Sequence, residues 1–513
     1  MAKVQPRKAD GEHPFLRLIE SVQEAENLRL ARKLDRARAV CATVLKEEPE
    51  YVAALFTMGL ILADQSQFEK AVGYLHRALM FNPHDPKILT ALSGVYIKLG
   101  SSLMAARTLE QARKISPDDP NILITLGEIY REEKEYEFAK DAYERALAVD
   151  PTRVDAEMGL AQNLNAIGHL AEAAALFEKR IKEGNRSLAC LYNLSQLPAS
   201  LVNIDLPSLL ADVKPGPGVD ADAFHSRLDF ARAAAFDKAG QHNDAWVQVC
   251  KARRYGNAEK RHAYKSQRER HTPLLELARS TQLDGERAET VSPDYPFSLF
   301  IAGPSRSGKT TLERLVGSLE GVKRGYENPI VENAVRRSFQ MAAFPTRSLL
   351  VQMPPGLNDL FRSFYLEELA RRAGSAKVMT NTLPQRTEDA LRAATEIPNA
   401  RFVFVKRDID DQTIRIFMRD YKSGNFYASD VRDIRDYLQW CHEMIDVTAE
   451  KLPASMYRVV TYEELVDDPA HVLTEVAALC GMDADGAALP PTGDDRGCAV
   501  PYRDYLREAV NSK

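Results

Sequence analysis

A short run near the middle of the chain has the composition of a phosphate-binding loop. The run GPSRSGKTT at 303–311 contains the spacing G-x-x-x-x-G-K-T, carried by Gly303, Gly308, Lys309 and Thr310. In this spacing the glycines let backbone N–H groups turn towards an anion, and the lysine adds a positive charge. An apolar β-type segment precedes the run at 296–303, and a helical pattern follows it at 312–321. Because a strand, a glycine loop and a helix N-terminus form an anion site in this order, the run predicts a phosphorylated ligand.

A second group of cations follows a later apolar segment. The segment ARFVFVK at 400–406 predicts a strand, and it leads into Arg407 and Asp408 directly after Lys406. Two adjacent cations suit a second phosphate better than a metal ion, whereas a P-loop ATPase needs an acidic Mg²⁺ ligand at the end of such a strand. The segments 348–355 and 457–465 predict two further strands, and the first of them ends without a carboxylate.

These motifs resemble those of sulfotransferases. The segment FIAGPSRSGKTTLERLV, from residue 300, resembles the loop G-x-P-R-S-G-T-T-L of the tyrosylprotein sulfotransferases and of bacterial sulfotransferases fused to tetratricopeptide repeats. Residues 407–411 resemble the family's R-D-P-x-D, and 458–469 resemble R-Y-E-D-L-V-x-D-P. The resemblance covers about residues 296–482. It implies a P-loop-type, three-layer α/β domain with a mostly parallel sheet, which uses 3′-phosphoadenosine-5′-phosphosulfate and a hydroxyl acceptor, releases 3′-phosphoadenosine-5′-phosphate, and needs no metal.

The same resemblance assigns roles to individual residues. Arg306 is expected to contact the transferred sulfuryl group, and Glu327, in the sequence Gly-Tyr-Glu, is expected to take the proton from the acceptor hydroxyl. Lys309 is expected to add a catalytic cation, in compensation for Thr382, which stands where the family has a lysine. The residues expected to bind the cofactor are Ser305, Arg306, Ser307, Gly308, Lys309, Thr310 and Thr311 at the 5′ side, and Arg407 and Arg415 at the 3′-phosphate.

Several positions depart from the family pattern, and they keep two alternatives open. The departures are Ser305, Lys309, Thr382, Ile409 and Arg415. Arg415 replaces a serine; on a helix it would lie about two turns from Arg407, where both could face one phosphate, or it could lie at the surface. The departures allow an interaction scaffold with an inactive domain, which would bind a protein partner but no cofactor. The G-K-T spacing allows a P-loop kinase or ATPase, which would turn over ATP with Mg²⁺.

An array of repeats precedes these motifs. Three columns recur every 34 residues: Pro49, Pro83, Pro117 and Pro151; Ala25, Gly59, Ser93, Gly127 and Ala161; and Ala37, Ala71, Ala105, Ala139 and Ala173. Small residues at this period allow two helices to cross closely, and proline ends the second helix of each unit. The columns resemble the tetratricopeptide repeat and predict an α-solenoid of about five units. Its concave groove predicts a protein or peptide partner, with a spacer or oligomerisation scaffold as the alternative.

The sequence pattern divides the chain into four parts. We expect a tail at 1–19, tetratricopeptide-like repeats at 20–190, a helical connector with a further repeat-like helical pair at 191–292, and the sulfotransferase-like domain at 293–513. The basic run at 260–271 is expected to form a solvated helix face.

Composition restricts the class of protein. Of 513 residues, 45% are hydrophobic and 27% charged, with a net charge of −5, so the chain has the composition of a globular protein and not that of a dedicated nucleic-acid binder. We see no stretch long enough to span a membrane and no signal-like N-terminus. The six cysteines form no close pair that would suggest a disulfide framework or a metal site. We therefore expect a cytoplasmic protein without nucleic-acid, membrane or metal partners, while its acceptor and oligomeric state stay open.

Overall fold

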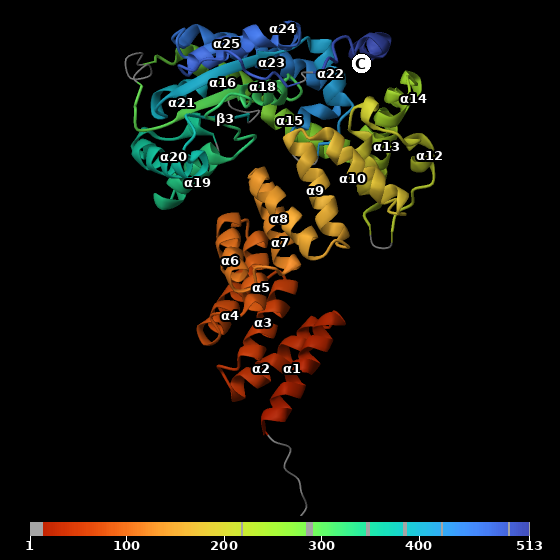
Figure 1. Ribbon diagram of the computed structural model, residues 1–513, viewed down its shortest axis with the longest axis vertical. Coiled ribbons are helices and arrows are strands. Elements are labelled where there is room, and N and C mark those ends of the chain that lie inside the picture. Colours follow the sequence, from red (N-terminus) through yellow and green to blue (C-terminus); the bar gives the residue numbers. More distant parts are fainter. Residues whose placement is uncertain are drawn as a thin grey trace, which may run out of the picture. The chain divides into compact units, whose positions relative to one another are not determined.

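The computed structural model of the chain describes residues 14–216, 219–283, 291–344, 349–382, 387–421, 424–490 and 493–511. By its internal contacts the chain divides into two units, Met1–Ile167 and Gly168–Lys513. Figure 1 shows both with their elements labelled. In the part of the chain that is described, no helix combines the length and the apolar character needed to cross a bilayer.

The first unit is built from pairs of helices. They are α1 (Pro14–Leu30), α2 (Leu34–Glu47), α3 (Val52–Asp64), α4 (Phe68–Phe81), α5 (Pro86–Lys98), α6 (Ser102–Ile115), α7 (Pro120–Glu132), α8 (Tyr136–Val149) and α9 (Val154–Ile167). These helices confirm the predicted α-solenoid. Pro83 lies in the turn after α4, as the repeat pattern predicts for a residue that cannot continue a helix.

The small-residue columns mark the positions where paired helices cross. A Cβ atom added to Gly59 in α3 would lie 2.7 Å from the side chain of Leu75 in α4, and one added to Gly127 in α7 would lie 2.7 Å from Tyr143 in α8. The residues of the alanine column that belong to this unit are fully buried; they are Ala37, Ala71, Ala105 and Ala139. Larger side chains at either column would separate the helices, so the 34-residue period records the packing of each pair.

The second unit contains a five-stranded parallel sheet in the order β2-β3-β1-β4-β5. The strands are β1 (Phe297–Ala302), β2 (Val322–Lys323), β3 (Val378–Asn381), β4 (Ala400–Lys406) and β5 (Tyr457–Thr461). The strand predicted at 348–355 is wrong: its described residues form the short 3₁₀ turns Leu350–Gln352 and Pro355–Leu357. Two adjacent prolines, Pro354 and Pro355, lack the N–H groups that a ladder needs.

Helices cover both faces of the sheet and confirm the predicted three layers. Alternate residues of β1 and β4, among them Leu299 and Val403, pack in one core with α18 (Lys309–Val316) and α25 (Pro469–Leu479). On the other face, Ser298 Oγ accepts a hydrogen bond of 2.8 Å from Tyr365 in α20 (Asn358–Ala373), and α21 (Ala390–Glu396) lies against β4. The other helices around the sheet are α19 (Ile330–Met341), α22 (Ile409–Phe417), α23 (Val431–Lys451), α24 (Tyr462–Asp467) and α26 (Arg503–Asn511).

In the second unit, a group of helices precedes β1, and several of them pack against the α/β layers. They are α10 (Leu170–Lys182), α11 (Leu188–Ser195), α12 (Leu206–Ala211), α13 (Ala221–Lys238), α14 (His242–Arg254), α15 (Asn257–Arg268) and α16 (His271–Ser280). The buried guanidinium of Arg253 donates hydrogen bonds to the carbonyl oxygens of Ile416, Phe417 and Arg419 at 3.0, 2.7 and 2.7 Å. A cation in this position satisfies the free carbonyls at the C-terminal end of α22.

The basic run at 260–271 is not simply a solvated face, contrary to the prediction. Tyr264 is 2% exposed and donates a 3.0 Å hydrogen bond to Asp436 of α23, and the His271 ring stacks on Trp440 at 4.0 Å. Other side chains of the run, among them Arg261, Lys265 and Arg268, are exposed as predicted, and the two arginines pair with Asp430 and Asp436. The predicted division points at 190/191 and 292/293 follow the sequence pattern and stay predictions.

Candidate functional site

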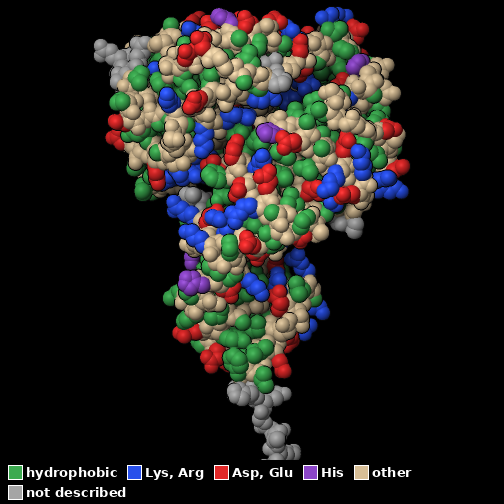
Figure 2. All heavy atoms as spheres, viewed as in Figure 1, with side chains coloured by type: hydrophobic (Ala, Val, Ile, Leu, Met, Phe, Trp, Pro, Cys, Tyr) green, Lys and Arg blue, Asp and Glu red, His purple; other side chains and the backbone are tan. Residues whose placement is uncertain are grey.

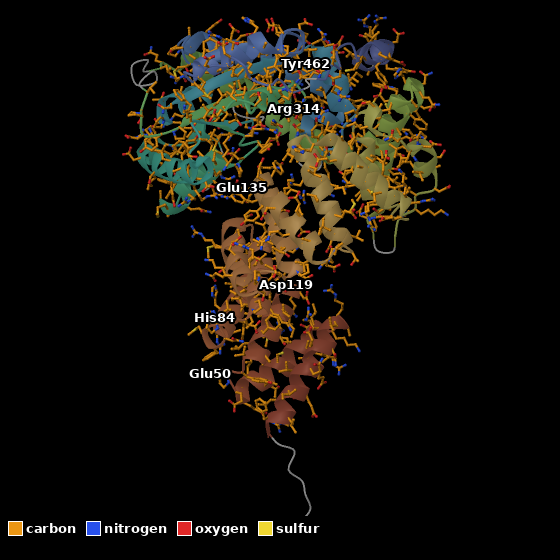
Figure 3. The ribbon with its side chains drawn as sticks, viewed as in Figure 1. Glu50, His84, Asp119, Glu135, Arg314 and Tyr462 are labelled. Carbon is orange, nitrogen blue, oxygen red and sulfur yellow. The ribbon has the colours of Figure 1, made fainter. Side chains whose placement is uncertain are left out.

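The loop between β1 and α18 requires its two glycines. Gly303 has φ +150°, and a Cβ there would lie 2.5 Å from the carbonyl oxygen of Val405 in β4. Gly308 has φ +107°, and a Cβ there would lie 2.7 Å from the ring of Tyr462, which Figure 3 labels at the start of α24. A side chain at either position would push neighbouring backbone or ring atoms away. The loop ends at the N-terminus of α18. The first N–H groups of this helix have no acceptor within the helix.

Lys309 lies inside this loop. Its side chain is buried, and its Nζ donates hydrogen bonds of 2.8 Å to the carbonyl oxygens of both Gly303 and Pro304. Burial lowers the pKa of Lys309 to about 8, although the nearby charge of Glu327 opposes the shift. Ser307 is fully buried, and its Oγ has no hydrogen-bond partner among the described residues. A buried ammonium group and an unpartnered hydroxyl beside a helix N-terminus form a cradle for an oxyanion.

Arg306 belongs to a larger group of positive charges. Its backbone has φ +65°, and water reaches the residue, but the surrounding protein displaces enough hydration to lower its pKa to about 10. Repulsion from Arg415 and Arg419 contributes to the same shift. Figure 2 shows Lys and Arg side chains gathered where the surface of the second unit is hollowed.

The cations predicted after β4 lie beside the loop. Arg407 is 3% exposed in its side chain; its guanidinium covers the Tyr462 ring at 4.2 Å, and its Nη1 lies 3.4 Å from the carbonyl oxygen of Arg306. Arg407 and Arg415 both pair with the carboxylate of Asp495, at 2.8 and 2.9 Å. Burial acts to raise the pKa of Asp495, but Arg415 and Arg407 outweigh it and the net shift is downward.

The loop that carries Glu327 is held by a buried polar network. The N–H of Tyr326 donates to Glu313 Oε1 at 2.7 Å, Thr380 Oγ1 donates to the same oxygen at 2.6 Å, and the N–H of Gly325 donates to Thr380 Oγ1 at 3.0 Å. Glu313 is fully buried, which raises its pKa. Glu327 itself is exposed. The network fixes the backbone immediately before Glu327, whose carboxylate stays exposed.

The structure brings the predicted site residues to one edge of the sheet. The loop after β1 and Arg407 after β4 lie at the carboxyl ends of adjacent parallel strands, where the order of connections reverses. Ligands bind at this place in open parallel sheets. Thr382, at the end of β3, donates its N–H to the Tyr326 carbonyl at 2.9 Å and so lies beside the Glu327 loop. Of the expected 5′-side residues, Ser305 is half-buried, Thr310 is exposed and Thr311 is half-buried.

Sequence reasoning missed two carboxylates of this region. Glu313 had a signal, because it lies beside Leu312 and three residues before Val316, on the apolar side of a short helix. Asp495 had none, because it is 88 residues from Arg407 in the chain. Among the described residues, no group of three or more His, Cys, Asp or Glu side chains is arranged to hold a metal ion.

Comparison with known proteins agrees with both resemblances. Residues 296–486 match the model of the Sulfotransferase family, and residues 28–93 and 120–153 match models of the Tetratricopeptide repeat. The chain is 22% identical over 212 residues to a protein-tyrosine sulfotransferase of Drosophila melanogaster, covering 40% of this chain and 42% of that one. It is 22% identical over 200 residues to an uncharacterized protein of Aquifex aeolicus, covering 37% of this chain and 26% of that one. The chain thus spans less than half the length of either relative.

Solved tetratricopeptide repeat structures also align with part of the chain. A tetratricopeptide repeat protein of Parabacteroides merdae aligns with TM-score 0.37 at 18% identity, over 47% of this chain and 93% of that one. A thermophilic repeat protein of Thermus thermophilus aligns with TM-score 0.30 at 20% identity, over 35% of this chain and 97% of that one. The family matches confirm a sulfotransferase-family segment that follows tetratricopeptide repeats.

Proposed function

We propose that this chain, which carries a sulfotransferase-family domain behind tetratricopeptide repeats, transfers a sulfuryl group from 3′-phosphoadenosine-5′-phosphosulfate to a hydroxyl acceptor. One observation carries the proposal: two cationic oxyanion sites lie at the ends of the adjacent strands β1 and β4, and Arg407 touches the backbone of Arg306. A nucleotide with a 5′- and a 3′-phosphate needs two such sites. A nucleotide that is bound through a P-loop alone would need only the first of these sites.

The residues present fit this cofactor. The buried, unpartnered Oγ of Ser307 and the buried Lys309 ammonium suit the 5′-phosphosulfate, and Arg407 with Arg415 suits the 3′-phosphate. The cofactor, when bound, supplies the sulfuryl group and a phosphate leaving group. Arg306 and Lys309 stabilise the negative charge that develops between the sulfuryl group and the leaving phosphate. They do so because fixed cations in a partly dehydrated site act strongly on such charge.

Glu327 acts as the base. Its exposed carboxylate takes the proton from the acceptor hydroxyl, and Glu313 and Thr380 act as positioning residues by holding the loop on which it stands. The charge of Glu327 acts to raise the pKa of Lys309, which supports a common reaction site.

The acceptor is proposed to be a peptide or protein hydroxyl recruited by the repeat groove. The support is the presence of tetratricopeptide repeats, together with a relative named for protein-tyrosine sulfation. A cytoplasmic location stays a prediction from the sequence.

The decisive experiment is a calorimetric titration of the full chain with 3′-phosphoadenosine-5′-phosphate, with ATP plus Mg²⁺ in parallel. We expect micromolar binding of the bisphosphate without metal and tighter than that of ATP. Preference for ATP would favour the kinase or ATPase. Binding of neither nucleotide would overturn the proposal in favour of an interaction scaffold.

A further inference from the structure

The arginine pair assigned to the 3′-phosphate already holds an anion of the chain itself. Asp495 Oδ1 lies 2.8 Å from Arg407 Nη2, and its Oδ2 lies 2.9 Å from Arg415 Nε. One carboxylate thus bridges two arginines that come from the beginning of α22 and from its last turn. A phosphate that bridges the two arginines would compete with Asp495 for these nitrogen atoms, because arginine presents its donors in a fixed planar fork.

The pair has more hydrogen-bonding capacity than Asp495 uses. The Nε of Arg407 is buried and has no hydrogen-bond partner among the described residues, although the side chain is only 3% exposed. A carboxylate has two oxygens, whereas a phosphate offers a third and about one more negative charge. The unused donor shows that the pocket around Arg407 is incompletely satisfied by Asp495 alone.

The segment that carries Asp495 is anchored independently of the Asp495 side chain. The carboxylate of Asp411 accepts the N–H groups of Gly497 and Ala499 at 2.6 and 2.9 Å, and the Tyr462 hydroxyl accepts the N–H of Asp495 at 3.3 Å. The Asp495 side chain is 31% exposed. The carbonyl oxygen of Asp495 also accepts a 3.1 Å hydrogen bond from Arg407 Nη2. A rotation of the Asp495 side chain towards water therefore releases Arg415 and the carboxylate contact of Arg407, while the backbone contacts of the segment stay in place.

We propose that Asp495 occupies the 3′-phosphate position in the cofactor-free protein and must leave it when the nucleotide binds. Asp495 then competes with the 3′-phosphate and determines how strongly this enzyme prefers nucleotides that carry one. The inference rests on the proposed function, since it takes the Arg407–Arg415 pair as the 3′-phosphate site. If Asp495 closes the site in nine tenths of the molecules, it weakens 3′-phosphate binding about tenfold.

The test compares two nucleotides that differ only in the 3′-phosphate. The full chain and its Asp495→Asn variant are titrated with 3′-phosphoadenosine-5′-phosphate and with adenosine 5′-monophosphate. We expect Asp495→Asn to bind the bisphosphate about tenfold more tightly and the monophosphate with unchanged Kd. Asp494→Asn is the matched control: Asp494 is adjacent, exposed and paired with Arg496, so its loss is expected to change neither Kd.

The outcomes separate this inference from the proposed function. If the bisphosphate binds the wild type and neither folded variant, Asp495→Asn or Asp495→Ser, binds it more tightly, Asp495 is only a structural counter-ion of Arg407 and the inference is overturned. If neither nucleotide binds wild type or variant, the proposed function itself fails and the inference fails with it. Asp495→Ser is measured alongside, so that a gain for the bisphosphate alone in either folded variant supports the proposal.

Discussion

At the scale of single residues, the proposed site combines a buried cation with an exposed carboxylate. Lys309 is buried with two carbonyl oxygens as its hydrogen-bond partners, and Glu327 is exposed on a loop that Glu313 holds. In the proposed reaction the two groups serve different purposes: Lys309 stabilises negative charge and Glu327 accepts a proton.

Removing the proposed base should separate catalysis from binding. Glu327→Gln keeps the shape of the side chain and loses the ability to accept a proton, so we expect turnover to fall about 10²–10⁴-fold. The Kd of 3′-phosphoadenosine-5′-phosphate should stay unchanged. The measurement is sulfuryl transfer to a hydroxyl acceptor. The control is Glu332→Gln, which changes a glutamate in the first turn of α19. Wild-type turnover in Glu327→Gln would show that another group takes the proton.

Lys309 should couple binding to proton uptake. With a pKa of about 8 in the free protein, Lys309 is largely neutral at pH 9, and a bound phosphate raises that pKa by favouring the charged form. Binding of 3′-phosphoadenosine-5′-phosphate at pH 9 should therefore take up a proton, and its affinity should fall as the pH rises through about 8.

Calorimetry in buffers of different ionisation enthalpy measures this uptake. Lys309→Thr removes the titrating group, so the uptake should disappear and turnover should fall sharply. Equal proton uptake in wild type and Lys309→Thr would mean that a different group titrates.

At the scale of elements, the site is made by the ends of parallel strands. The order β2-β3-β1-β4-β5 places the loops after β1 and β4 beside each other, although about a hundred residues separate them in the chain. Gly303 lies against the backbone at the end of β4, and Gly308 lies against Tyr462 after β5. Neither position has room for a side chain, which makes the loop geometry specific to glycine.

A methyl group at Gly308 should disrupt the phosphate loop. Gly308→Ala introduces a Cβ 2.7 Å from the Tyr462 ring at a backbone φ of +107°, so we expect the Kd of 3′-phosphoadenosine-5′-phosphate to rise at least about tenfold. Gly356→Ala is the control, because Gly356 has ordinary φ and open space around it. The two Kd values are compared by calorimetry, after circular dichroism has shown that both variants fold; equal values would contradict the geometry.

At the scale of the whole molecule, the helices α14, α15 and α16 of the second unit are stabilised by contacts with the α/β domain that follows them. Arg253 reaches from α14 to the end of α22, and Trp246 stacks on Tyr505 of α26 at 5.1 Å. Tyr264 and His271 bury aromatic rings against α23. These helices support α22, which carries Arg415, so the connector stabilises one side of the proposed 3′-phosphate site.

Breaking the Arg253 contact should destabilise the second unit. Arg253→Ala leaves buried carbonyl oxygens without donors, at a cost of about 1–3 kcal/mol for each unsatisfied group. We expect a lower urea midpoint for the transition of the second unit, with the transition of the repeats unchanged. The control is Arg254→Ala, since Arg254 is the neighbouring exposed arginine. Equal midpoints for the two variants would show that Arg253 contributes nothing to this stability.

The sequence by itself determined the repeats, the phosphate loop and most strands, because each is local. A column repeated every 34 residues reports contacts between neighbouring helices, and G-x-x-x-x-G-K-T reports the dihedral angles and charge of one loop. Local pattern failed at 348–355, where two prolines outweighed an apolar run, and at 260–271, where a polar run buries the rings of Tyr264 and His271.

Only the tertiary structure decided which charges meet. Asp495 pairs with Arg407 and Arg415, which are far from it in the chain. Likewise, Glu313 and Thr380 hold the Glu327 loop through hydrogen bonds between distant residues. No spacing records such contacts, because they arise where parallel strands from separate segments end at one edge of the sheet. The sequence could therefore name Arg407 and Arg415, the arginines of the proposed 3′-phosphate site, while the carboxylate that pairs with them became visible only in the fold.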